Sequence, residues 1–342
     1  DVVAAVNSAH IGDQVWVAAG NYTVAGGTWV SPGVRLYGGF VGNEPDNYDV
    51  TQRNLNANRT ILSNNPGDYT VIGVWGYEKQ FPQDTSQVID GFTTKGTGMG
   101  IAAFNCSPTI SNNQVVGQTG NWPGGINIGN SDGAVITNNL IDSNVGVGDG
   151  GGIGIFSCAV NWGVGAWNWN GNPYVVARFK PTKVSLSGNT ITNNTGRFGG
   201  GVEVWYSHLA ITNNLIKGNT ARESGGGISI ANTDALIDNN VISGNVAAVS
   251  SSDSIAGGIL SSNWDGNPYY RGQSTITNNT ITDNSSLNRG GGVIVWGQQA
   301  TIQRNYIAHN TSYMGSAIWA GRETEVSLID ISNNLIVNSV GV

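Results

Sequence analysis

The stretch "ITNNLIDSN", residues 136–144, decides the fold, because close copies of it recur along the chain. Examples are "ISNNQV" at 110–115, "LSGNTI" at 186–191 and "ISNNLI" at 331–336. The equivalent asparagines are Asn113, Asn139, Asn189, Asn214, Asn240, Asn279, Asn305 and Asn334. Successive spacings are 26, 50, 25, 26, 39, 26 and 29 residues, so a period of about 25 to 26 explains four of the seven. Self-similarity at such a period is the signature of a repeat architecture.

Each repeat consists of short alternating segments separated by corners rich in asparagine and glycine. A second asparagine follows five residues after the first, and then a glycine cluster leads into a strand pattern such as "GGGIGIF" (150–156) or "GGGVEVW" (199–205). Period-2 alternation indicates strands, and Gly and Asn tolerate the left-handed backbone of a tight corner. The repeat leaves no room for a crossover helix. Stacked repeats would bury a continuous apolar interior, and asparagines at one corner could hydrogen-bond to each other up the stack.

This pattern resembles the right-handed parallel β-helix repeats (PbH1-type) of the pectate-lyase-like superfamily, over residues 96–342. Residues 1–95 resemble the first coils of such helices in extracellular bacterial proteins, through "GDQVWVAAGNYT", "GVRLYGGFVGNE" and "VIDGFTTKG". We therefore predict one all-β, single-stranded right-handed parallel β-helix with about 25 to 26 residues per coil. Residues 1–95 would form its N-terminal coils, and 96–342 its regular coils. The resemblance implies an extracellular or cell-surface protein and identifies no substrate.

The charge composition excludes some partners. The net charge is −7, the pI is about 4.8 and only 11% of residues are charged. Nucleic acids and anionic membrane surfaces need clustered Lys and Arg, so we expect neither as a partner. No run of 18 apolar residues exists, so no membrane insertion is expected. The last residues, "ISNNLIVNSVGV", stop in mid-pattern, and we expect the natural chain to be longer.

Two insertions interrupt the repeat, near 158–181 and 262–273. Both leave the stack after the same strand, and they share the motif NW-N/D-GNPY. Their aromatic residues are Trp162, Trp167, Trp169, Tyr174, Trp264, Tyr269 and Tyr270. Aromatic rings in loops expose flat surfaces on which sugars can stack. The alternative is that these rings fold back over an apolar patch.

The strand after each glycine cluster has an inward and an outward face. Counted from the last glycine, positions +1 and +3 point inward, and positions +2 and +4 outward. The outward +4 column holds Phe104, Phe156, Trp205 and Trp296. Glu203 is the only outward carboxylate, and we expect it to be exposed beside this column. Outside the insertions, the predicted substrate-binding residues are Phe156, Trp205, Tyr206 and Trp296.

The candidate chemistry is polysaccharide cleavage. A glycoside hydrolase needs two carboxylates, for which Glu203 and Asp149 are candidates. A lyase needs a base and a group that neutralises a uronate, for which Arg197 and His208 are candidates. The alternative is that these are solvated corner residues. The aspartate cluster of β-helix polygalacturonases is absent from the sequence.

No metal or cofactor motif stands out. The three histidines and the scattered acids form no recognisable ligand set, so we expect no cofactor, with calcium left open. Cys106 and Cys158 share a register position with one full coil between them, which places their Cα atoms about 9.6 Å apart in a regular stack. A disulfide needs less than about 7 Å, so the bond requires the first insertion to bend the backbone.

Two classes of function remain. The first is an extracellular carbohydrate-active enzyme, a lyase or hydrolase acting in a groove beside Glu203 and Trp205. The second is a non-catalytic, adhesin-like β-helix of the cell surface. We predict binding of a polysaccharide or cell-surface glycan, and leave catalysis and oligomeric state undecided.

Overall fold

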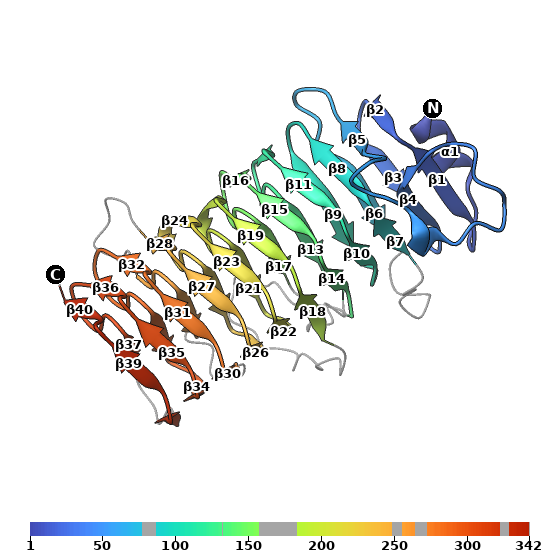
Figure 1. The fold of residues 1–342 in the computed structure, drawn as a ribbon. Coiled ribbons are helices and arrows are strands. Elements are labelled where there is room, and N and C mark those ends of the chain that lie inside the picture. Colours follow the sequence, from blue (N-terminus) through green and yellow to red (C-terminus); the bar gives the residue numbers. More distant parts are fainter. Residues whose placement is uncertain are drawn as a thin grey trace, which may run out of the picture.

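The computed structural model describes residues 1–76, 87–131, 133–156, 183–247, 255–263, 272–321 and 328–341. In these residues the chain winds into an elongated stack of coils, from the N-terminus at one end to the C-terminus at the other (Figure 1). Every strand pairing in the four sheets is parallel, and each sheet takes one strand from successive coils. The predicted right-handed parallel β-helix is confirmed. The right hand is the one that twisted strands favour for parallel crossovers.

Two sheets run the length of the stack. The strands of sheet A are β1 (Gln14–Ala18), β4 (Arg35–Phe40), β7 (Val88–Asp90), β10 (Thr109–Ser111), β14 (Val135–Thr137), β18 (Val184–Ser187), β22 (His208–Thr212), β26 (Asp234–Asp238), β30 (Gln273–Thr277), β34 (Gln299–Gln303) and β38 (Ile329–Ser332). The strands of sheet B are β2 (Gly20–Thr23), β5 (Thr60–Ser63), β8 (Phe92–Lys95), β11 (Gln114–Val116), β15 (Leu140–Asp142), β19 (Thr190–Thr192), β23 (Leu215–Lys217), β27 (Val241–Ser243), β31 (Thr280–Thr282), β35 (Tyr306–Ala308) and β39 (Leu335–Val337).

The other two sheets contain the segments around the glycine clusters. The strands of sheet C are β3 (Thr28–Val30), β6 (Thr70–Trp75), β9 (Met99–Phe104), β13 (Ile126–Gly129), β17 (Ile153–Phe156), β21 (Val202–Trp205), β25 (Ile228–Ala231), β29 (Ile259–Ser262), β33 (Val293–Trp296) and β37 (Ile318–Gly321). The strands of sheet D are β12 (Thr119–Gly120), β16 (Val145–Gly146), β20 (Thr195–Phe198), β24 (Thr220–Ser224), β28 (Val246–Ala247), β32 (Ser285–Ser286), β36 (Thr311–Ser312) and β40 (Val340–Gly341).

Two short helices lie in the N-terminal coils. Helix α1 (Val2–Ser8) packs against β1 and β3, with Val2 and Val6 buried, and Asp1 caps its first turn through the amides of Val3 and Ala4. A carboxylate at this position satisfies amides that have no partner within the helix. The 3₁₀ helix η1 (Val50–Gln52) lies in the long connection between β4 and β5. The sequence patterns did not predict either helix.

Two asparagine ladders hold the corners. In the first, Nδ2 of Asn139 donates to Oδ1 of Asn189, and Asn189 donates in the same way to Asn214, each at 3.0 Å. The second runs in the same manner from Asn144 through Asn194 and beyond. Each amide also donates to a main-chain carbonyl of the preceding coil. The predicted Asn stacking is therefore confirmed, and it pairs polar groups that the stack has removed from water.

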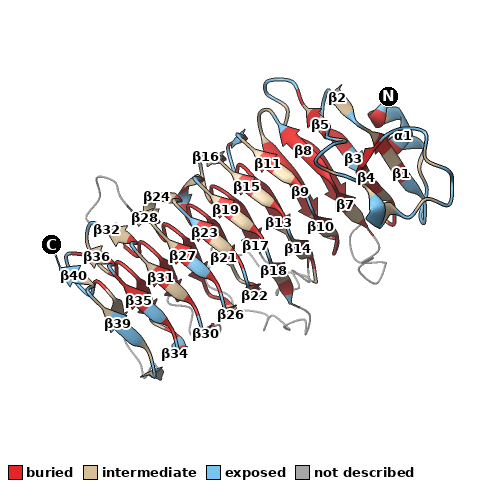
Figure 2. Cartoon of the chain, viewed as in Figure 1, coloured by how far each residue is buried: buried red, intermediate tan, exposed pale blue. Residues whose placement is uncertain are grey.

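Inward residues of sheet C form part of one continuous apolar core. Ile153, Ile155, Val202 and Val204 are fully buried, and the other inward side chains of the sheet from β3 to β33 behave alike (Figure 2). The strand register matches the predicted alignment, since Ile153 pairs with Val202. Because these residues point into the core, the side chains that alternate with them along each strand point outward.

One prediction about the outward face is wrong. The +2 column was expected to be exposed, but it is buried: Asn127 is 4% exposed, Leu260 1% and Ile294 0%. The reason is the corner before the strand, which folds back over this column. A Cβ placed on Gly225 would come within 2.6 Å of Ser229, and the corner glycines generally leave room for the side chains beneath them. From β9 to β33 only the +4 column remains partly open, whereas at the two ends of sheet C the +2 column is open as well, at Trp29 and Trp319.

Candidate functional site

Glu203 lies on β21 with its side chain on the outer face of sheet C, yet it is 0% exposed. The expectation of an exposed carboxylate is therefore wrong. The covering corner comes from the preceding coil, where Gly150 lies so close that a Cβ there would be 3.1 Å from Cβ of Glu203. Its carboxyl oxygen Oε1 accepts a hydrogen bond of 2.7 Å from Nε1 of Trp205, two residues along the same strand.

Burial, assisted by the negative charge of Asp149, raises the pKa of Glu203 to about 8. The indole N–H of Trp205, the amide of Gly150 and the positive charge of Arg197 act in the opposite direction. A carboxyl group removed from water holds its proton because the charged form loses its hydration. Glu203 is therefore a neutral acid at neutral pH.

A group of charged residues surrounds Glu203 at the junction of sheets D and C. The amide of Arg197 donates to the carbonyl of Asp149 at 2.9 Å, which joins the two coils at this corner. The guanidinium Nε of Arg197 lies 2.6 Å from Oε1 of Glu223. Burial raises the pKa of Asp149 and the Arg197 charge opposes this effect, while Glu223 raises the pKa of Arg197. The sequence-predicted residues Asp149, Arg197 and Glu203 thus come together.

The orientation of Trp205 is fixed from two sides. Glu203 holds its indole nitrogen, and the ring of Phe198 packs edge-on against it, with centroids 6.5 Å apart and planes at 69°. The guanidinium carbon of Arg197 stands 4.9 Å from the centroid of the Phe198 ring. Trp205 itself stays partly exposed. The arrangement presents a positioned indole on the surface.

Trp205 belongs to a group of aromatic residues on the outer face of sheet C, which we call the C-face platform. The described members are Trp29, Trp75, Phe104, Phe156, Trp205, Trp296 and Trp319. Strand register places Trp75 beside Phe104 and Phe156 beside Trp205 on neighbouring coils. The Trp75 and Phe104 centroids are 5.5 Å apart. From β6 to β33 the platform spans seven strand spacings, or about 34 Å at 4.8 Å each.

Glycines let several of these rings lie over the backbone. A Cβ on Gly129 would stand 2.6 Å from Cδ1 of Phe104, and a Cβ on Gly73 would stand 2.3 Å from Cε3 of Trp29. Any larger residue at these places would push the ring outward. The Phe104 and Trp29 rings therefore keep one side against the sheet, while Trp29 is still 37% exposed and Trp75 48%.

The C-terminal part of the platform carries its own cation. Trp296 and Trp319 have centroids 5.5 Å apart, and the guanidinium of Arg289 stands 5.9 and 5.3 Å from the two rings. Beneath them, Leu260 and Ile294 form a small apolar cluster outside the main core. This cluster explains why the +2 column is apolar here.

The remaining site predictions divide into two groups. His208 begins β22 in sheet A, beyond the corner that follows Trp205, and its Nε2 lies 3.4 Å from a carboxylate oxygen of Asp234. Tyr206 occupies the corner itself, with a φ of 49°. The aromatic residues predicted in the insertions lie outside the described residues: Trp162, Trp167, Trp169, Tyr174, Trp264, Tyr269 and Tyr270. Cys158 also lies there, so its pairing with the buried Cys106 stays a prediction.

Five aromatic residues of the site were missing from the predicted set, among them Phe104, which was named only as a member of the +4 column. Trp29, Trp75 and Trp319 lie on strands without the full glycine triplet that served to align the repeats. Aligning their alternating apolar residues instead would have found Trp75, which pairs with Phe104. Phe198 carried no recognisable sequence signal, because its contact with Trp205 depends on the path of the corner.

Neither a metal-binding cluster nor a membrane-spanning helix occurs in the described residues. In the described ranges, no three side chains among His, Cys, Asp and Glu gather closely enough to hold a metal ion. Among the same residues, no helix has the length and apolar character needed to cross a membrane.

Comparison with known proteins finds similarity at the level of the backbone. No protein-family model matches the chain. No curated protein matches it by sequence. Similar solved structures include an alginate lyase from a Paenibacillus species (15% identity, 94% of this chain and 96% of the other, TM-score 0.49). A second is the A-module of a mannuronan C-5 epimerase from Azotobacter vinelandii (15% identity, 98% of this chain and 94% of the other, TM-score 0.39). A third is a surface protein and adhesin of Streptococcus pneumoniae (12% identity, 99% of this chain and 92% of the other, TM-score 0.42). At such identities, these proteins' activities say nothing about the activity of this chain.

Proposed function

We propose that this protein is an extracellular polysaccharide-binding β-helix, whose C-face platform holds a glycan chain along the helix axis. The observation that carries the proposal is the fixed, partly exposed indole of Trp205, held by Glu203 and Phe198 within the platform. Rigid aromatic rings provide contact area at low entropic cost, which suits the apolar faces of sugar rings.

The length of the platform favours a chain over a single sugar. Aromatic pairs occur at three places along sheet C: Trp75 with Phe104, Phe156 with Trp205, and Trp296 with Trp319. Between Trp205 and Trp296 the +4 positions are small, namely Ala231 and Ser262, and both are buried. A polymer that runs along the axis can contact all three pairs at once, and linked contacts strengthen one another.

The charges beside the platform favour an acidic polysaccharide. Arg197 is half-exposed, and Arg289 stands over the Trp296 and Trp319 rings. Protonation of Glu203 removes a negative charge from the same surface. Although the chain as a whole is acidic, this face therefore attracts uronate or sulfate groups more than the average surface does.

Glu203 acts in this proposal as a positioning residue. It is fully buried and its carboxyl group accepts the hydrogen bond of Trp205, so it orients the ring without touching the glycan. A glutamine keeps an amide oxygen to accept the indole N–H, whereas leucine does not.

The second candidate is acid catalysis of glycan cleavage. Glu203 and Asp149 are neighbouring carboxyl groups with raised pKa values, an arrangement that glycosidases use for a general acid. Catalysis would require the covering corner at Gly150 to move, so that Glu203 reaches the substrate. The two candidates predict opposite behaviour of Glu203→Gln.

The test is affinity electrophoresis in gels that contain alginate, pectate, chondroitin sulfate, xylan or mannan. We expect the wild-type protein to be retarded in at least one acidic gel, and Trp205→Ala to lose about tenfold in affinity. Glu203→Gln should keep the retardation, and Glu203→Leu should lose most of it. Unchanged retardation of Trp205→Ala would overturn the proposal.

The same polysaccharides, incubated with the protein in solution, separate binding from cleavage. Reducing ends and the absorbance of unsaturated products are measured over time. The binding proposal predicts no product from the wild type. Product that disappears in Glu203→Gln, while that variant is still retarded in the gel, would instead establish the catalytic candidate.

A further inference from the structure

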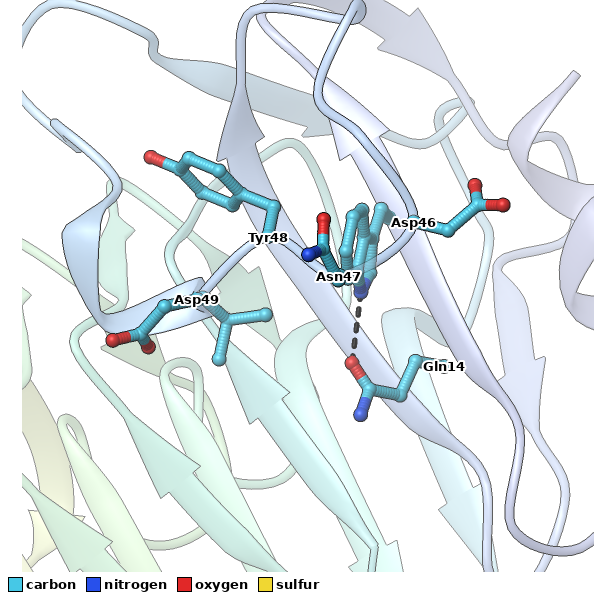
Figure 3. A pocket seen from close by; sticks show the side chains of 7 residues that line it. Gln14, Asp46, Asn47, Tyr48 and Asp49 are labelled. Carbon is cyan, nitrogen blue, oxygen red and sulfur yellow. Dashed lines mark hydrogen bonds between the residues drawn. The ribbon is translucent and has the colours of Figure 1, made fainter.

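A pocket in the N-terminal coils lies on another sheet than the platform. Its cavity has a volume of about 660 Å³ and opens widely to solvent on sheet A (Figure 3). The lining residues come from β1 and from the connection after β4: Gln14, Trp16, Asp46, Asn47, Tyr48, Asp49 and Val50. Sequence patterns gave no sign of it, because its two segments lie about thirty residues apart and share no motif.

Trp16 lines this pocket and is held in place. Its ring stacks on the buried ring of Phe40, with centroids 4.8 Å apart and planes at 9°. The ring of Tyr48 stands edge-on to Trp16 at 6.4 Å. The indole N–H donates to Oε1 of Gln14 at 2.9 Å, as Figure 3 shows. Trp16 remains half-buried, so part of the indole is presented to the cavity.

The loop that walls the pocket is tied to the β-helix. Arg53 donates from Nε to the carbonyl of Val50 and from a terminal nitrogen to the carbonyl of Gly38. Its other terminal nitrogen pairs with Asp90 at 2.5 Å, and both side chains are 7% exposed. At the start of the loop, Glu44 accepts from the amides of Val41 and Gly42. A loop fixed in this way needs little ordering when a ligand binds.

The polar groups of the pocket determine the ligand class. Asp46 and Asn47 are exposed, and Figure 3 shows Asp46 and Asp49 at opposite ends of the pocket. Hydrogen bonds from Thr51 hold the pKa of Asp49 below its usual range, so this carboxylate is ionised at neutral pH. Carboxylate and amide oxygens accept hydrogen bonds from sugar hydroxyl groups, but two acids repel a uronate or a sulfate.

We propose that this pocket is a second carbohydrate site, which binds a neutral sugar unit on Trp16 and rejects acidic sugars. It needs no contact with the C-face platform and does not depend on that proposal. A protein with both sites would bind two chemically different glycans, one acidic and one neutral.

The test uses saturation-transfer NMR and tryptophan fluorescence with neutral hexasaccharides of glucose, mannose, galactose and xylose, and with trigalacturonate as the acidic probe. We expect the wild type to bind a neutral hexasaccharide and to show no binding of trigalacturonate in the pocket. Trp16→Ala should weaken the neutral binding by about tenfold or more, while Trp205→Ala leaves it unchanged.

Trp16→Ala removes a ring that packs on Phe40 and so can also lower stability. A second, milder variant therefore tests the binding separately. Asn47 is exposed, so Asn47→Ala should keep the fold and weaken neutral binding roughly three- to tenfold through a lost hydrogen bond. Absence of binding by all four neutral probes would overturn the proposal. So would unchanged binding in Asn47→Ala and Trp16→Ala, or loss of the neutral binding in Trp205→Ala.

Discussion

The buried acid of the site predicts an unusual dependence of stability on pH. Burial raises the pKa of Glu203 from its ordinary value of 4.5 to about 8 in the folded protein. Between these values the folded state holds one more proton than the unfolded state at this residue, so stability falls as the pH rises. A tenfold change in proton affinity corresponds to about 1.4 kcal/mol, so the full effect approaches roughly 5 kcal/mol above pH 8.

The perturbation is Glu203→Gln, which removes the titrating group and keeps an acceptor for the indole of Trp205. Urea unfolding, followed by far-UV circular dichroism, is measured from pH 4.5 to 8.5 for both proteins. Near pH 4.5 we expect similar free energies of unfolding. Near pH 8.5 the variant should be more stable by several kcal/mol, because it has no charge to bury.

Two controls sharpen this prediction. The pKa of Glu44 is lowered rather than raised, so Glu44→Gln should show no gain relative to wild type as the pH rises. Arg197 lowers the pKa of Glu203, so Arg197→Gln should raise that pKa further, and the loss of stability between pH 4.5 and pH 8.5 should be larger than in the wild type. A difference between wild type and Glu203→Gln that does not change with pH would refute the reasoning.

The remaining predictions concern the ladder, the corners and the platform. Asn189→Ala removes hydrogen bonds to a carbonyl and to two neighbouring asparagines, so the free energy of unfolding in urea should fall by roughly 2 to 4 kcal/mol. The control Asn21→Ala, at an exposed position, should lower it by less than about 0.5 kcal/mol. Gly152→Ala would place a Cβ 2.6 Å from a backbone oxygen and should cost more than about 2 kcal/mol. Gly129→Ala meets only the Phe104 ring, so it should change stability little but weaken glycan retention in the gel. Retention of an acidic polysaccharide should fall as salt is raised, because exposed guanidinium charges are screened.

The fold was predictable because the residues that determine it repeat. Asn139 and its equivalents must align to form a ladder, and this alignment sets the register of every neighbouring strand. That register put Phe156 beside Trp205 and put Val202 and Val204 in the core, as expected. A parallel stack in which each coil adds one strand to each sheet allows few other arrangements once the period is known.

The site was less predictable, because alternation shows which face a side chain is on and not what covers that face. Glu203 was expected in solvent, and the neighbouring corner at Gly150 buries it. Nothing in the local pattern specifies the path of that corner or brings Phe198 against Trp205. The pocket at Trp16 was invisible for a similar reason, since its wall is a non-repeating loop held by Arg53 and Asp90.

The central claim is that a polysaccharide lies on the C-face platform at Trp205. The most direct measurement is a crystal structure of the protein with an oligosaccharide taken from the polysaccharide that retards it in the gel. The account predicts electron density for a sugar ring against the Trp205 indole, with the chain running along sheet C. Density for the oligosaccharide elsewhere, with the Trp205 ring uncontacted, would contradict it.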